Sequence, residues 1–121
     1  PDLWHLRHME DPRSISQGSI MPAYPWLLTD ELDFDFISRE VKAQVTLGVP
    51  YSEAEVASAV EDARQQAREI AERLEKEGGV SGLETRKIVA LIAYLQRLGT
   101  DIKRPLEPQP APEPSPVPRQ E

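Results

Sequence analysis

The sequence predicts an all-α fold, and three observations favour this class. Apolar residues recur at helical spacing in several segments of the 121-residue chain. Capping residues, glycines and prolines bound those segments. No stretch alternates apolar and polar residues for more than a few positions. Aromatic residues make up only 6% of the chain, so we expect a thin core built from aliphatic helix faces.

The first predicted helix covers residues 2–10. Asp2 is its expected N-cap, and Asp11-Pro12 should end it, because proline disfavours helical backbone in the residue before it. Three apolar residues recur at spacing three and should share one face: Leu3, Leu6 and Met9.

Residues 14–30, which we name the methionine loop, show neither helical nor strand periodicity. Pro22 and Pro25 stiffen the loop, since each proline fixes its own φ and pushes the preceding residue towards extended backbone. The preceding residues are Met21 and Tyr24. We therefore expect an ordered apolar loop that holds the Met21 side chain in place.

Two further helices are predicted over residues 35–77. The first runs from Phe36 to Leu47, after a group of acids that suit a helix N-terminus (Asp30, Glu31, Asp33 and Asp35). The second begins at a capping box, Ser52 with Glu55, and should end at Gly78-Gly79. On the exposed face of the second helix we expect Glu69 to pair with Arg73, and Glu72 with Lys76.

The second of these helices carries apolar residues at alternating spacings of four and three, as in a heptad repeat. They are Val56, Val60, Ala63, Ala67, Ile70 and Leu74. Because most of these side chains are small, we expect the helix to pack on another element, with a partner subunit as one possibility.

The terminal helix is predicted over residues 84–98, with Gly99 at its end. Its apolar stripe consists of Ile88, Leu91, Ile92, Leu95 and Leu98. From Pro105 onward seven of 17 residues are proline, so residues 101–121 are predicted to form a disordered or polyproline II-like tail.

The composition excludes several classes of function. With 21 acidic and 14 basic residues the net charge is −7, which argues against a nucleic-acid partner. The chain has no cysteine, so it cannot by itself form disulfides, thiolate metal sites or thioether links to a haem. No apolar run is long enough to cross a membrane, so we expect any membrane anchor to lie outside this chain.

Met21 is the residue with the clearest chemical potential. A thioether is a soft ligand that binds haem iron and raises its reduction potential. Pro22, Tyr24 and Trp26 could wall a flat apolar cofactor, and Arg13 could pair with a cofactor carboxylate. Both interpretations have ordinary alternatives: methionine is a common packing residue, and Arg13 could instead pair with Asp11 or Glu10.

His5 and His8 are three residues apart on the first helix, a spacing that can bring two imidazoles to one metal ion. Few further ligands lie nearby in the sequence, so we favour capping, packing or hydrogen bonding as the role of both residues. A small metal-binding helical domain is therefore a separate hypothesis.

Two runs of residues resemble the mono-haem subunit of cbb3-type cytochrome c oxidases. The first is Trp4-His5-Leu6-Arg7-His8-Met9-Glu10-Asp11-Pro12-Arg13-Ser14, and the second is Ser19-Ile20-Met21-Pro22-Ala23-Tyr24-Pro25-Trp26-Leu27. The resemblance continues through Thr46-Leu47-Gly48-Val49-Pro50-Tyr51 and closes with the segment from Ala90 to Thr100, which looks like the terminal helix of a cytochrome c.

This resemblance implies that residues 1–100 form the C-terminal part of a cytochrome c-like domain with a long inserted helix. It also implies haem c as the cofactor and Met21 as its distal iron ligand. Pro22, Tyr24, Trp26 and Arg13 would lie around the haem. The family attaches its haem through a Cys-x-x-Cys-His motif, which this chain lacks and which we expect upstream of Trp4.

The same resemblance implies a non-catalytic electron-transfer subunit at the periplasmic face of a bacterial inner membrane. Its partners would be a di-haem cytochrome c subunit, which supplies electrons, and the haem–copper subunit that reduces oxygen. The alternative from a different class is a cofactor-free helical scaffold within a respiratory membrane complex, which the missing cysteines and the heptad pattern favour.

Overall fold

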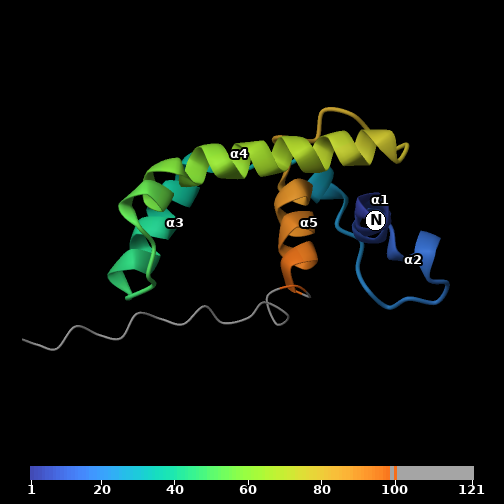
Figure 1. Cartoon of the computed structure of the whole chain (residues 1–121). Coiled ribbons are helices and arrows are strands. Elements are labelled where there is room, and N and C mark those ends of the chain that lie inside the picture. Colours follow the sequence, from blue (N-terminus) through green and yellow to red (C-terminus); the bar gives the residue numbers. More distant parts are fainter. Residues whose placement is uncertain (99, 101–121) are drawn as a thin grey trace, which may run out of the picture.

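The computed structural model describes residues 1–98 and Thr100, and this part of the chain is helical, as predicted. In chain order the elements are α1 (Asp2–Glu10), α2 (Pro12–Ile15), the 3-10 turn η1 (Pro25–Leu28), α3 (Phe34–Thr46), α4 (Glu53–Lys76) and α5 (Lys87–Leu98). The longest helix, α4, crosses the whole molecule in Figure 1. The helix α3 lies below one end of α4, and α5, α1 and α2 lie below its middle and its other end. The predicted cap at Gly99 and the predicted tail over 101–121 lie outside the described residues.

The long helix α4 begins at the predicted capping box. The Ser52 hydroxyl accepts a hydrogen bond from the Glu55 backbone N–H at 3.2 Å, and the Glu55 carboxylate accepts one from the Ser52 backbone N–H at 2.8 Å. Two hydrogen bonds from Ser52 to the Glu55 carboxylate lower the pKa of Glu55 below its usual value, because both favour the charged form. The bond from the Ser52 backbone N–H has the larger effect, and the bond from the Ser52 hydroxyl has the smaller one. The helix therefore starts where local chemistry satisfies its free N–H groups.

The end of α4 is equally well defined. The Gly79 N–H donates to the Leu74 carbonyl oxygen at 2.7 Å, and a Cβ at position 79 would lie only 2.8 Å from that oxygen. Gly78 adopts a φ of 89°, in the left-handed region that glycine enters without steric cost. Both predicted stop residues thus have a specific structural reason.

The apolar seam of α4 packs inside the same chain. Ala67, Ile70 and Leu74 are buried, while Val60 and Ala63 pack against the edge of the core. The elements that cover α4 are α3, α1 and α5. Most of this face is therefore covered within the chain, while Ala63 at its edge also lines a hollow between α3 and α5.

Asp2 has a different role from the one predicted. It does not cap α1, whose N-cap residue is Pro1 and makes no side-chain hydrogen bond. Asp2 is instead buried, at 4% exposure, and its carboxylate accepts hydrogen bonds from Arg73 Nε at 2.9 Å and from Gln96 Nε2. One buried carboxylate thus ties α1 to both α4 and α5.

The exposed face of α4 also differs from the prediction. Arg73 pairs with Asp2, and Glu69 accepts a hydrogen bond from Gln65 at 3.0 Å. The side chain of Glu77 reaches α1, where its carboxylate accepts the Leu3 backbone N–H at 2.7 Å and so replaces the missing side-chain cap. Long-range partners have therefore displaced part of the predicted i, i+4 pairing.

The end of the methionine loop is fastened to the beginning of α5. The Leu32 N–H donates to the Thr85 carbonyl at 2.8 Å, and the Lys87 N–H donates to the Asp30 carbonyl at 3.0 Å. The Lys87 ammonium also lies 3.0 Å from the Asp30 carboxylate. Asp30 therefore belongs to this junction, whereas Asp33 caps α3 by accepting two backbone N–H groups.

The terminal helix α5 is shorter at its start than predicted, because residues 84–86 form the junction with the loop. Ile88 and Ile92 are buried as predicted, and Val89, which was not predicted, is buried with them. The remaining members of the predicted stripe, Leu91, Leu95 and Leu98, are only partly covered or exposed.

Candidate functional site

The methionine loop is tied down on both sides of Met21. On the N-terminal side, the Met21 N–H donates to the Ser19 hydroxyl at 3.2 Å, and Arg13 Nε donates to the Ser19 carbonyl at 3.4 Å. On the C-terminal side, the Tyr24 N–H donates to the Met9 carbonyl of α1 at 2.7 Å. The loop is therefore ordered, as the prolines predict.

Arg13 acts at the base of this loop. Its backbone N–H donates to the Asp11 carboxylate at 3.1 Å, which caps the short helix α2. Its side chain donates to the Ser19 carbonyl and does not form the alternative ion pair with Asp11 or Glu10 among the described residues. Arg13 thus positions the segment that leads into Met21.

The two methionines of the chain have different surroundings. Met9 packs against the hydrophobic core through α1. Met21 is half-buried and does not belong to that core within the described residues. The hydrophobic core therefore accounts for Met9 and does not include Met21.

Two aromatic residues follow Met21 in the loop. The Tyr24 and Trp26 rings meet edge to face, with centroids 5.1 Å apart. The Trp26 side chain is 48% exposed, although it lies beside the anchored end of the loop. Pro22 is exposed as well. The residues predicted to wall a cofactor thus present apolar surface that the described residues leave uncovered.

A second uncovered apolar surface lies on α5. Leu91 and Leu95 are half-buried, and Tyr94 and Leu98 are 61% and 52% exposed. Since α5 packs against η1, the turn that ends the methionine loop, this flank belongs to the same end of the molecule. Sequence reasoning placed these leucines in the core. Within the described residues this flank of α5 is only partly covered.

His5 and His8 lie on either side of one indole ring. The His8 ring stacks on Trp4 at a centroid distance of 4.7 Å, and the His5 ring meets it edge-on at 5.2 Å. His8 Nδ1 is buried and has no hydrogen-bond partner among the residues that the structure describes. No group of three or more His, Cys, Asp or Glu residues is placed to hold a metal ion in the part of the chain that the structure describes.

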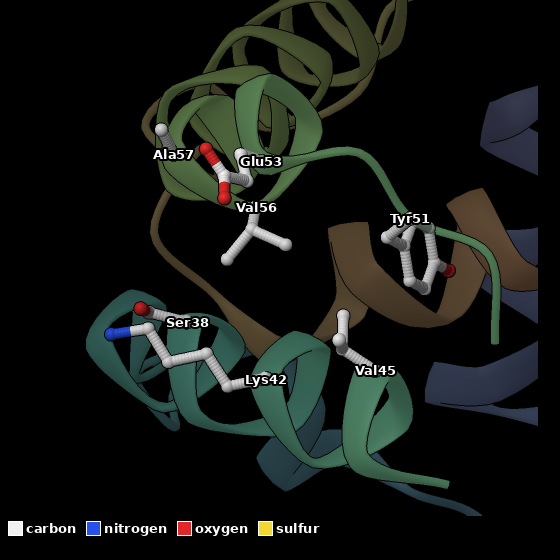
Figure 2. A pocket seen from close by; sticks show the side chains of 7 residues that line it. All are labelled: Ser38, Lys42, Val45, Tyr51, Glu53, Val56 and Ala57. Carbon is white, nitrogen blue, oxygen red and sulfur yellow. The ribbon is translucent and has the colours of Figure 1, made fainter. Parts of the chain in front are cut away.

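A separate hollow lies far along the sequence from the methionine loop, between α3 and the first turns of α4. Val45 and Val56 face each other across it, and Lys42 and Glu53 stand at its edge (Figure 2). None of the predicted site residues lines this hollow.

None of the helices in the described residues is both long and apolar enough to cross a bilayer.

Side chains on the methionine loop, α1 and α5 have the chemistry that one side of a haem site needs. Met21 supplies a soft sulfur donor, the two loop aromatics and the uncovered α5 leucines supply apolar surface, and His8 Nδ1 is a buried polar atom without a partner in the described residues. The chain has no cysteine for thioether attachment. Covalent attachment would therefore require residues other than these 121.

Comparison with known proteins agrees with this arrangement. No curated protein sequence matches the chain. A family model described as cytochrome c oxidase, mono-heme subunit/FixO, matches residues 1–102 and so spans most of the sequence. The chain therefore belongs to the FixO family, the mono-haem subunits of cytochrome c oxidase.

Proposed function

We propose that this chain forms the distal side of a haem c site, with Met21 as the axial ligand to the iron. The observation that carries the proposal is the contrast between the two methionines. Met9 is explained by the core, whereas Met21 is held by an anchored loop with its side chain outside the core. The family supports haem c as the cofactor, because its members are mono-haem subunits.

The surrounding residues would keep the ligand in place and keep water away. Arg13 and Ser19 hold the backbone before Met21, and the bond from Tyr24 to Met9 holds the backbone after it. Trp26 and the α5 leucines would cover apolar parts of the cofactor. A low-dielectric setting of this kind, together with a thioether ligand, raises the reduction potential of the iron.

We further propose the route of the electrons. When bound, the haem supplies one-electron redox chemistry, and the subunit would relay electrons from a di-haem cytochrome c subunit to the haem–copper subunit. The site would lie at the periplasmic face of a bacterial inner membrane, and segments other than these 121 residues would provide the haem attachment and the membrane anchor. The chain itself would perform no oxygen chemistry.

The test is the absorption spectrum of the full gene product, purified from cells that mature c-type haem. We expect a far-red band from methionine-to-iron charge transfer, lost in Met21→Ala and Met21→His. The matched control is Met9→Leu, which should destabilise the protein but keep the band, because Met9 packs in the core. A band that survives both changes at Met21 would refute the ligand assignment.

The alternative function is a cofactor-free helical scaffold. The missing cysteines favour it. Its second support, the heptad pattern of α4, is weaker now, because that face packs on α1, α3 and α5 of the same chain. A gene product that carries no haem when purified under the same conditions would favour the scaffold.

A further inference from the structure

A channel runs beneath α4 between α3 and α5, and the proposed haem site does not use it. Both helices pack on α4, but nowhere in the described residues do their Cα atoms come within 8 Å of each other. Figure 1 shows α3 and α5 on the same side of α4, separated from each other along its length. Two hollows that share Ile37, Ala63 and Gln66 lie in this space.

The walls of the channel are mainly apolar and carry small side chains. The apolar lining includes Ile37 and Val41 of α3, Ala59 and Ala63 of α4, and Ala90 and Ala93 of α5. Alanines on two of the three walls permit close approach of another backbone, since the distance between packed helices depends on the side chains at the contact. The channel therefore suits a helix better than a flat surface.

The edge of the channel is acidic. Glu40, Glu55, Asp62 and Glu69 line the two hollows, against one cation, Arg97. Asp62 accepts a hydrogen bond from the neutral Ser58 hydroxyl, and Glu69 accepts one from the neutral Gln65 amide. Complementarity therefore calls for an occupant that carries positive charge beside its apolar surface.

We propose that this channel is the docking site for a basic amphipathic helix of a partner protein. The apolar stripe of that helix would lie against the channel alanines, and its lysines or arginines would lie along the acidic edge. A second copy of this chain is a poorer occupant, because the chain has a net charge of −7. The hollow in Figure 2 is a poorer site, because Lys42 and Glu53 give its edge both signs of charge.

The test uses the full 121-residue chain and a labelled synthetic helix with a leucine and alanine stripe flanked by lysines. Fluorescence anisotropy should show binding that is about tenfold or more weaker for the same peptide with glutamates in place of the lysines. A scrambled peptide of the same composition, which has no apolar stripe, should also bind more weakly.

Two matched variants locate the site. Ala90→Arg places a large cation inside the channel, whereas Ala57→Arg places the same charge in the hollow of Figure 2. Ala90→Arg should weaken binding of the lysine peptide by about tenfold or more, and Ala57→Arg should change it by less than about twofold. Circular dichroism would show that both variants remain folded, because both alanines are exposed on helix surfaces.

Several results would overturn the proposal. Equal binding of the lysine and glutamate peptides would show that the acidic edge does not select the occupant. Equal effects of the two variants would show that the peptide does not bind in the channel. A dimer in sedimentation that Ala90→Arg dissociates would assign the channel to a second copy. Displacement of the lysine peptide by a synthetic peptide of residues 101–121 would assign it to this chain's own C-terminal segment. None of these measurements involves Met21, so the haem proposal is tested separately.

Discussion

The two halves of α4 are stabilised in different ways. The C-terminal half contains Ile70 and Leu74, both fully buried, and receives α1 and α5. The N-terminal half is covered by α3 and depends on its capping box and on exposed pairs such as Ser58 with Asp62. One continuous helix therefore has a half that long-range packing stabilises and a half that local interactions stabilise.

This difference has a functional consequence. The C-terminal half of α4 lies at the end of the molecule that carries the methionine loop and the proposed iron ligand Met21. The local half carries α3 and one wall of the proposed docking channel, where a partner would supply the missing contacts. Four tests of the contrast follow, from the largest expected effect to the smallest.

The largest effect is expected for Leu74→Ala in the C-terminal half. Leu74 is completely buried, so the substitution should leave a cavity and lower the free energy of unfolding by about 2–5 kcal/mol. Its counterpart Val56→Ala, at a half-buried position in the N-terminal half, should cost about 1 kcal/mol or less. Urea unfolding followed by circular dichroism would measure both, and equal losses would contradict the contrast.

Asp2→Asn should have the next largest effect. It removes the charge that accepts bonds from Arg73 and Gln96, so we expect a loss of about 1–3 kcal/mol, reduced because the Arg73 side chain is half exposed. The control is Glu61→Gln, which breaks an exposed pair and should cost about 0.5 kcal/mol or less. A loss for Asp2→Asn no larger than the control would show that α1 is held by its apolar face alone.

Ser52→Ala tests the N-terminal half of α4, which local interactions stabilise. It removes the hydroxyl that accepts the Glu55 N–H and should lower the free energy of unfolding by about 1 kcal/mol. Hydrogen exchange should show the opening confined to the first turns of α4 and not spread to Leu74. If the whole helix lost protection together, the two halves would have to be treated as one cooperative unit.

The smallest effect concerns pH. The pKa of Glu55 is lower in the folded chain than in the unfolded one, so its capping contribution is present above the unfolded pKa and is lost as the pH falls through the folded pKa. Chemical denaturation should show a difference between Glu55→Ala and the unchanged chain at about pH 7 that shrinks by about pH 3. A difference that persists in acid would point to packing by the Glu55 side chain.

Local signals in the sequence predicted much of the fold. The capping box at Ser52, the stop at Gly78-Gly79 and the end of the first helix at Asp11 all lie within a residue of their observed places. Each of them depends on atoms only a few residues apart. The apolar seam of α4 was also read correctly, because a helical period fixes which side chains share a face.

The candidate site was predicted in part. The prolines around Met21 predicted an ordered loop, and the loop is ordered. The uncovered flank of α5 was missed, because a stripe of leucines has the same pattern whether it faces a core or faces a cofactor. The exposure of Leu98 and Tyr94 among the described residues shows only that this flank lies outside the core.

By itself, the sequence determined the helical class, the end of α1, both ends of α4 and the family, whose model matches residues 1–102. The tertiary structure alone decided which partners the charged residues take. Asp2 bonds to residues 71 and 94 positions away in the chain, and no local rule connects them. The physical reason is that capping and periodicity act over one or two helical turns, whereas burial of a carboxylate depends on which helices meet around it.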